Sequence, residues 1–256
     1  MYMVGGYVRD EIMGVKSNDI DFSVVLDDWD AASVDPYKVM VGLLEQKGFE
    51  IFKDKEGNPI SGEFLTARGK FPKNHSIYPN VVADFVLARK EGDYTDGRRP
   101  DKVEVGTLDD DLARRDFTMN AIAKYEWVDD DSDGVDYIDP FNGREDIAQG
   151  IIRAVGDPFE RLTEDALRAV RALRFAVTKN MAIEPQLDFF LQSAAVLDAI
   201  VNKISDERIS AELSKMFRYD TVDSLTILSL YPSLTEAMFS GRVSLDSTLK
   251  TKGRGK

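Results

Sequence analysis

Gly5-Gly6-Tyr7-Val8-Arg9-Asp10 and, shortly after it, Asp19-Ile20-Asp21-Phe22-Ser23-Val24-Val25 form the stretch of sequence that decides the fold. This order of residues predicts a glycine turn, a short helix from Tyr7 to Met13 and an acidic strand from Asp19 to Leu26. Side chains two positions apart point to the same face of a strand, so Asp19 and Asp21 should lie side by side. Carboxylate oxygens are the ligands that Mg²⁺ prefers, together with water and substrate phosphates. The stretch therefore predicts a Mg²⁺ site.

The glycine turn adds a second chemical feature. Without side chains, Gly5 and Gly6 let the backbone approach a phosphate, and the N-terminus of the following helix offers N–H groups to the same anion. Arg9 would add a positive side chain. Alone, a double glycine is usually a tight turn and an Asp-x-Asp pair a solvated strand edge. Their combination in the order turn, helix, acidic strand favours a phosphate-binding metal site.

Composition limits the class of protein. The chain has 256 residues, 43% of them hydrophobic and 31% charged, which is typical of a globular protein without a membrane span. No signal peptide precedes the first strand, so the expected location is cytoplasmic. With no cysteine and one histidine, the sequence excludes disulfides, thiolate metal sites and histidine-rich metal sites. A net charge of −13 means that any nucleic acid must be held by a local basic strip.

The first half of the chain alternates strands and helices. A helix is predicted from Pro36 to Lys47, and strands are predicted at 49–53, 63–67, 81–87, 121–127 and 135–138. After Pro158, apolar residues recur at helical spacing, namely Leu162, Ala166, Val170, Leu173 and Val177, then Ile209, Leu213 and Phe217. The expected fold class is α+β, with a mixed sheet first, helices after it and a boundary near residue 150.

Asp84 is an acidic residue within an otherwise apolar predicted strand. A buried, unpaired carboxylate is costly, so it must find a cation, a metal or solvent. On a strand next to Asp19 and Asp21, it would complete a two-metal site. The alternative is a salt bridge to Arg89 or a place at the edge of the sheet, and spacing alone does not separate these explanations.

An arginine-rich segment lies at residues 111–121, Asp-Leu-Ala-Arg-Arg-Asp-Phe-Thr-Met-Asn-Ala. It sets the guanidinium groups of Arg114 and Arg115 next to an acid and to the amide of Asn120. Guanidinium groups match phosphate oxygens bidentately, which suits a triphosphate. Taken by itself, the segment is better explained as a surface ion-pair cluster.

One continuous helix is predicted from Glu164 to Phe175, with Arg168, Arg171 and Arg174 forming a cationic stripe opposite its apolar face. Asp165 and Arg168 would project side by side as an acceptor and a donor, able to hydrogen-bond the Watson–Crick edge of a base. The alternative is an ion pair within the helix, from Glu164 or Asp165 to Arg168, and for the helix alone this is the better explanation.

Taken in order, these segments resemble the class II tRNA nucleotidyltransferases and bacterial poly(A) polymerases. The matching segments are Gly-Gly-x-Val-Arg-Asp (5–10), Asp-x-Asp (19–21), Asp-Gly-Arg (96–98), Asp-Leu-x-Arg-Arg-Asp-Phe-Thr-x-Asn-Ala (111–121), Asp-Pro-Phe-x-Gly (139–143), Glu-Asp-x-x-Arg (164–168) and Ile-Ser-x-Glu-Arg-Ile-x-x-Glu-Leu (204–213). The resemblance covers roughly residues 3–218. Asn18 departs from the lysine that many members carry before the acidic pair, and members normally continue past this C-terminus with further helices.

The resemblance implies a nucleotidyltransferase head with a mixed β-sheet over residues 1–150, an all-helical neck that recognises the base over 151–204, and a partial helical body over 205–256. It implies that Asp19 and Asp21 hold two Mg²⁺ ions and that Asp84 is the third catalytic carboxylate. The other implied nucleotide-binding residues are Gly5, Gly6 and Arg9 at the triphosphate, supported by Arg114, Arg115 and Asn120, and Asp165, Arg168 and Arg171 at the base. Asp96 and Arg98 fall in the family's mobile loop, linked to the switch from C to A.

The implied activity is template-independent addition of C and A nucleotides from CTP and ATP to the 3′ end of tRNA, with release of pyrophosphate. Two alternatives stay open. Poly(A) polymerases and enzymes that add only A share every segment above. A nucleotide or RNA binder without turnover is the non-enzymatic alternative, and intact Asp19 and Asp21 weigh against it.

Overall fold

The computed structural model describes residues 1–17, 19–26, 35–60, 65–91, 103–128, 133–240 and 243. The chain divides into two compact units. The sheet unit comprises residues 1–91, 102–115 and 119–144, and the helical unit comprises residues 116–118 and the described part of 145–256. Both units contain buried apolar side chains.

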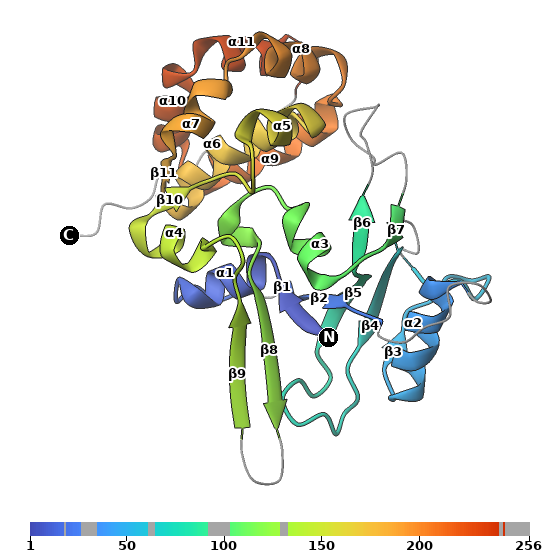
Figure 1. Ribbon diagram of the computed structural model, residues 1–256. Helices are drawn as coiled ribbons and strands as arrows, with labels where there is room; N and C mark the ends of the chain where they lie inside the picture. The colour runs from blue at the N-terminus through green and yellow to red at the C-terminus, as the bar shows by residue number, and fades with distance from the viewer. Residues whose placement is uncertain are drawn as a thin grey trace. The chain divides into compact units, whose positions relative to one another are not determined.

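The sheet unit is built on a seven-stranded sheet with the order β3-β4-β5-β2-β1-β8-β9 (Figure 1). Its strands are β1 (Tyr2–Val4), β2 (Asp21–Val24), β3 (Glu50–Ile51), β4 (Thr66–Lys70), β5 (Val82–Leu87), β8 (Ala123–Val128) and β9 (Asp133–Ile138). β2 and β5 run parallel, and the other neighbouring pairs are antiparallel. This mixed sheet, followed by helices, confirms the predicted fold class.

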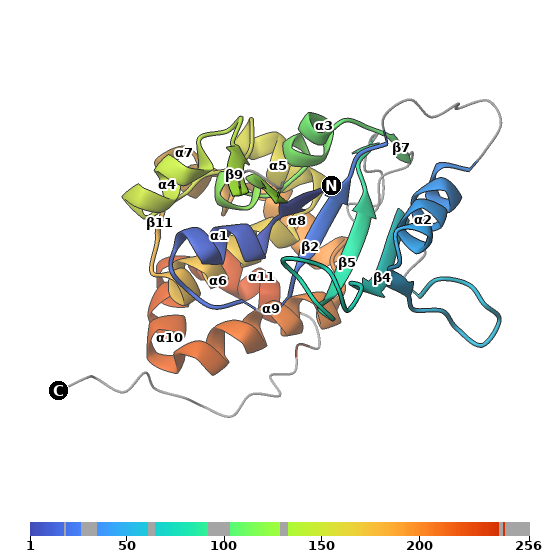
Figure 2. The same cartoon turned by 90° about the horizontal axis from the view of Figure 1, so that it is seen from below.

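In the described part of this unit, three α-helices and a two-stranded ribbon accompany the sheet. They are α1 (Gly6–Ile12), α2 (Pro36–Gln46) and α3 (Leu108–Ala113), with the ribbon formed by β6 (Arg89–Glu91) and β7 (Val103–Val105). α2 begins where expected, because the Asp35 side chain caps it and Pro36 fits its first turn. The Tyr37 hydroxyl donates to the carbonyl of Thr66 at 2.9 Å, which ties α2 to the β4 side of the sheet (Figure 2).

Aromatic side chains form much of the core of the sheet unit. Phe22 of β2 and Phe85 of β5 stack with ring centroids 5.6 Å apart, and Phe71 lies 5.3 Å from Phe22. All three are almost fully buried. Because a slip of one residue would turn these rings to the other face, the core fixes the register of the two parallel strands.

The helical unit contains eight described helices and a short parallel pair of strands. The helices are α4 (Gly143–Gln149, whose first two residues belong to the sheet unit), α5 (Pro158–Glu164), α6 (Leu167–Lys179), α7 (Pro185–Phe190), α8 (Ala194–Asn202), α9 (Asp206–Tyr219), α10 (Thr221–Leu230) and α11 (Pro232–Phe239), and the strands are β10 (Ile151–Ile152) and β11 (Ala182–Ile183). α6 packs against α9. The apolar residues predicted from periodicity on both helices are buried, which confirms that expectation.

Three predicted element boundaries are wrong. The acidic strand runs from Asp21 to Val24, so Asp19 precedes it. The strand expected at 63–67 is Thr66–Lys70. The helix expected from Glu164 is interrupted, because the Asp165 carboxylate accepts a hydrogen bond from the backbone N–H of Leu167 and competes with helical pairing.

Within the described segments, no helix is both long enough and apolar enough to cross a bilayer.

Candidate active site

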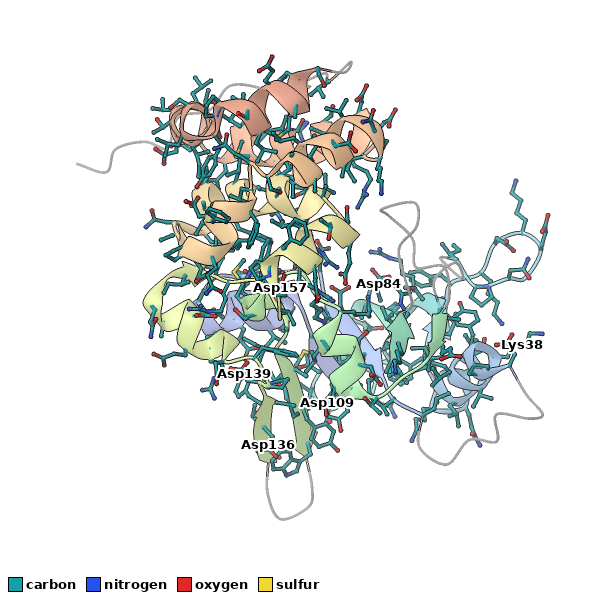
Figure 3. The ribbon with its side chains drawn as sticks, turned by 45° about the horizontal axis from the view of Figure 1, so that its top comes forward. Lys38, Asp84, Asp109, Asp136, Asp139 and Asp157 are labelled. Atoms are coloured by element: carbon teal, nitrogen blue, oxygen red, sulfur yellow. The ribbon has the colours of Figure 1, made fainter. Side chains whose placement is uncertain are left out.

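The candidate catalytic carboxylates lie at the parallel strands in the middle of the sheet. Asp21 is the first residue of β2, and the register with β5 sets it directly opposite Asp84, which Figure 3 labels. Asp19 lies two residues before β2. Burial raises the pKa of Asp21 to about 6 against the opposing charge of Arg115, and the negative charges of Asp84 and Asp19 add to the rise. The three acids therefore act on one another, and a bound cation would relieve their repulsion.

Asp84 also has a cationic partner within the sheet. The register of β4 with β5 places Arg68 opposite it, with Nη1 3.4 Å from Oδ2. The ion pair expected with Arg89 is therefore formed with Arg68 instead, and β5 is an interior strand rather than an edge. With 32% of its side chain exposed, Asp84 gains at most about 1 kcal/mol from this solvated pair. The carboxylate can therefore exchange this partner at little cost.

The donor set fits a hard divalent cation. Among the described residues, no group of three or more acidic or histidine side chains comes close enough together to enclose a metal ion. Mg²⁺ does not require such a cage, because one or two carboxylates and substrate phosphates suffice. Asp21 and Asp84 supply oxygens of this kind, with Asp19 beside them.

Gly5 has no side chain beside the carboxylate of Asp21. Its φ of 73° lies in the region that favours glycine, and a Cβ added there would lie 3.0 Å from Arg115 Nη1 and 3.7 Å from Asp21 Oδ2. A Cβ at Gly6 would lie 3.5 Å from Arg9 Nη2. The turn thus brings bare backbone next to one carboxylate and two guanidinium groups.

Gly5→Ala should lower the free energy of unfolding by about 1–3 kcal/mol, because the methyl group forces a strained backbone and crowds Arg115. Urea unfolding measures the change. Gly42→Ala, in the interior of α2 where a Cβ meets open space, is the matched control and should stabilise the protein by about 0.5–1 kcal/mol. Equal stability of Gly5→Ala and the parent would show that the turn does not need glycine.

Arg9 and Asn120 meet although they lie far apart in the sequence. Arg9 Nη1 donates to Asn120 Oδ1 at 2.7 Å, and Arg9 Nε donates to Asp10 Oδ1 at 2.8 Å. Arg9 is buried, so these bonds fix the direction of its guanidinium group. The structure thus brings two of the predicted phosphate-binding residues together and adds Asp10, to which the sequence analysis gave no role.

Arg114 and Arg115 share one carboxylate, that of Asp111. Arg115 Nη2 donates to Asp111 Oδ2 at 2.9 Å, and Arg114 Nε donates to Asp111 Oδ1 at 3.0 Å. Burial works to raise the pKa of Asp111, but the two guanidinium groups hold it below its usual range. The sequence analysis quoted Asp111 within its segment but assigned it no role at the site. Its signal was the spacing, three and four positions before the two arginines on one helical turn.

Asp165 and Arg168 do not share a helix. Asp165 has extended backbone between α5 and α6, with φ −144° and ψ 98°. Arg168 is buried, and its Nη1 donates to Glu164 Oε2 at 2.7 Å and to the Arg161 carbonyl at 2.9 Å. Asp165 is bound by Arg208 of α9 instead. The ion pair between Glu164 and Arg168 is present, but it joins α5 to α6 rather than lying within one helix. Base reading by Asp165 and Arg168 stays a prediction.

The arginines expected to form a cationic stripe on α6 are ion-paired inside the helical unit. Arg171 Nε and Nη2 donate to Asp116 Oδ2 at 2.9 and 2.7 Å. Arg171 and Arg174 both form ion pairs with Glu212 of α9, whose side chain is only 6% exposed. The stripe is absent from these described residues because α9 packs on α6 and supplies buried counter-charge, a long-range arrangement that helical spacing does not reveal.

Two predicted site residues, Asp96 and Arg98, lie outside the described residues.

Comparison with solved structures defines the class of protein as tRNA nucleotidyltransferase-like. A tRNA nucleotidyltransferase complexed with a primer tRNA and an incoming ATP analog aligns with a TM-score of 0.63 at 29% identity, covering 94% of this chain and 59% of that chain. The Bacillus stearothermophilus CCA-adding enzyme in complex with CTP aligns with a TM-score of 0.60 at 30% identity, covering 90% and 47%.

The chain belongs to the poly A polymerase head domain family, whose profile matches residues 1–153. The CCA-adding enzyme of Geobacillus stearothermophilus is 35% identical over 216 residues, covering 84% of this chain and 45% of that enzyme. The CCA-adding enzyme of Lactococcus lactis is 35% identical over 229 residues, covering 89% and 49%. The chain therefore spans about half the length of the curated relatives it matches, and the resemblance identified in the sequence is confirmed.

Proposed function

We propose that this chain is a Mg²⁺-dependent nucleotidyltransferase that adds C and A nucleotides to the 3′ end of tRNA. The observation that carries the proposal is the parallel register of β2 and β5, which sets Asp21 opposite Asp84 beside the bare backbone of Gly5. The relatives named CCA-adding enzymes, and solved relatives with tRNA, CTP or an ATP analog bound, support the choice of substrates.

In the proposed reaction, the 3′-hydroxyl of the RNA attacks the α-phosphate of CTP or ATP, and pyrophosphate leaves. Bound at Asp19, Asp21 and Asp84, two Mg²⁺ ions would supply activation of the hydroxyl and neutralisation of the leaving group. The protein's own contribution is positioning and fixed positive charge. Gly5 and Gly6 let backbone approach the triphosphate, with Arg9, Arg114, Arg115 and Asn120 supporting it.

Asp165 and Arg168 would read the base, as an acceptor and a donor aimed at its Watson–Crick edge. Each is held by a second charged residue, Asp165 by Arg208 and Arg168 by Glu164. Arg171 would act indirectly, because Asp116 and Glu212 occupy its guanidinium group. In this proposal residues 1–150 are the head, 151–204 the neck and 205–256 part of the body, and the location is cytoplasmic.

Incubation with labelled nucleotides tests the proposal. The chain is offered α-labelled CTP or ATP with three tRNA substrates, which lack CCA, lack CA or lack only the final A. We expect C to be added to the first two and A to the third, with release of pyrophosphate and loss of activity in EDTA. Long A tracts would identify a poly(A) polymerase, and labelling by ATP alone on the third substrate would identify an A-adding enzyme. If no tRNA is labelled although the chain still binds nucleotide, the result supports the non-enzymatic alternative, a nucleotide or RNA binder.

A further inference from the structure

The carboxylate of Asp165 is clamped by a residue from another helix. Arg208 Nη2 donates to Oδ2 at 2.7 Å and Arg208 Nη1 donates to Oδ1 at 3.3 Å, so the guanidinium fork binds both oxygens. The backbone N–H of Leu167 donates to Oδ1 at 3.1 Å. Both charged side chains are largely shielded, with 17% of Asp165 and 23% of Arg208 exposed. Such a pair holds its geometry better than an exposed ion pair.

The clamp comes from a rigid support. Arg208 lies in the first turn of α9, next to Ile209, which is buried, and α9 packs against α6. Asp165 itself lies in extended backbone between two helices, where no helical hydrogen bond fixes its side chain. Without Arg208, the Leu167 N–H would hold one oxygen only, and the carboxylate plane could turn. The orientation of Asp165 is therefore set by Arg208.

The clamp also limits what else Asp165 can accept. A carboxylate offers about four lone-pair sites, and Arg208 and Leu167 occupy three of them. One site remains for a single N–H donor. The exocyclic amino groups of cytosine and adenine are such donors, whereas uracil and guanine carry an acceptor oxygen at the corresponding position.

We propose that Arg208 is a positioning residue for base selection: by binding both oxygens of Asp165, it leaves one fixed acceptor site for an amino-bearing base. The proposal rests on the proposed function, because it assumes that Asp165 faces the base of the incoming nucleotide. Arg208 acts through Asp165 and touches neither the base nor the reacting phosphate. The ion pair between Arg208 and Asp165 shares no residue with the ion pair between Glu164 and Arg168, so the two can be tested separately.

The test measures discrimination in the full-length chain. The ratio of kcat/KM for CTP over UTP, and for ATP over GTP, is determined for the parent, Arg208→Ala, Arg208→Lys, Asp165→Ala and the double variant. Arg208→Ala should lower both ratios by about tenfold to a hundredfold, because a freed carboxylate can turn away from the amino group. Arg208→Lys should give ratios between those of the parent and those of Arg208→Ala, since lysine keeps the charge but cannot bind both carboxylate oxygens. The double variant should match Asp165→Ala within about twofold, because Arg208 acts only through Asp165.

Lys215→Ala is the matched control. It removes a cation from the same helix, one that pairs with Glu212 and is 59% exposed, and should leave both ratios unchanged. Melting curves identify variants that fail to fold. If Arg208→Ala fails to fold, the two discrimination ratios of Arg208→Lys test the proposal instead. A fall in kcat/KM for all four nucleotides with both ratios retained would mean a merely structural role and would overturn the proposal.

Failure of the proposed function gives a different result. If the parent incorporates no nucleotide, equilibrium binding of CTP, UTP, ATP and GTP to the same variants replaces turnover. Tighter binding of CTP and ATP by the parent, lost in Arg208→Ala, supports the role of Arg208 without catalysis. Equal binding of all four nucleotides by the parent overturns it.

Discussion

Asp21→Asn should lower the rate of nucleotide incorporation by about 10³-fold or more. The variant should be as stable as the parent protein or more stable. The loss follows from the proposed function, in which Asp21 helps to hold a metal ion whose charge stabilisation is worth several kcal/mol. The gain in stability follows because burial and the neighbouring acids raise the pKa of Asp21 to about 6, so its negative charge at pH 7 is costly to the folded state. Labelled incorporation and melting temperature measure the two effects.

Asp136→Asn is the control for this experiment. Asp136 is an exposed acid on β9 of the same sheet, labelled in Figure 3, and its replacement should change neither activity nor stability appreciably. Asp19→Ala should resemble Asp21→Asn in activity. Unimpaired turnover in Asp21→Asn would move the catalytic site away from β2 and β5.

Glu212→Gln should lower the free energy of unfolding by about 3–5 kcal/mol, the largest stability effect that we expect from a single substitution. Glu212 is buried and forms ion pairs with Arg171 at 3.7 Å, with Lys215 at 3.0 Å and with Arg174. Glutamine keeps the shape but leaves Arg171 and Arg174 without their shared counter-charge. Urea unfolding followed by far-ultraviolet circular dichroism measures the change.

The same residue should make stability depend on pH. Burial works to raise the pKa of Glu212, but Arg174, Arg171 and Lys215 hold it below the ordinary glutamate value of about 4.5. A depressed pKa stabilises the fold above pH 4.5, and this contribution is lost as pH falls through the lower folded-state value. In Glu212→Gln, the free energy of unfolding should lack this loss at low pH. Glu236→Gln, an exposed substitution on α11, should show the same pH dependence of stability as the parent. Identical urea midpoints for Glu212→Gln and the parent would refute the argument.

Local signals predicted much of the fold. Asp35 and Pro36 mark the start of α2, and the apolar spacing of Val170, Leu173 and Val177 marks the buried face of α6. One boundary failed because a side chain competes with the backbone: Asp165 interrupts a helix that spacing alone predicts. Short-range rules describe such elements well and their interruptions poorly.

For the candidate site too, the sequence indicated individual residues but not the contacts between them. The sequence indicated Asp21, Arg9 and Asn120 as members of separate motifs and Asp84 as an acid within an apolar strand. It did not indicate that Arg9 and Asn120 would be in contact. Residues that hold others in place, such as Asp116 and Arg208, were quoted in the matching segments, but their partners were not foreseen because these lie far along the chain. Pairings of this kind depend on how helices pack, and one sequence carries no periodic signal for them.

The parallel pairing of β2 with β5 also decides when the candidate site forms during folding. Parallel neighbours cannot be joined by a tight turn, and here α2, β3 and β4 lie between them in the chain. Closing so long a loop is slow compared with forming a helix, which needs only nearby residues. A nascent chain that has exposed its glycine turn and Asp21 still lacks Asp84, Arg115 and Asn120. Synthesis must therefore pass the 111–121 segment before the emerging polypeptide can assemble the whole candidate site.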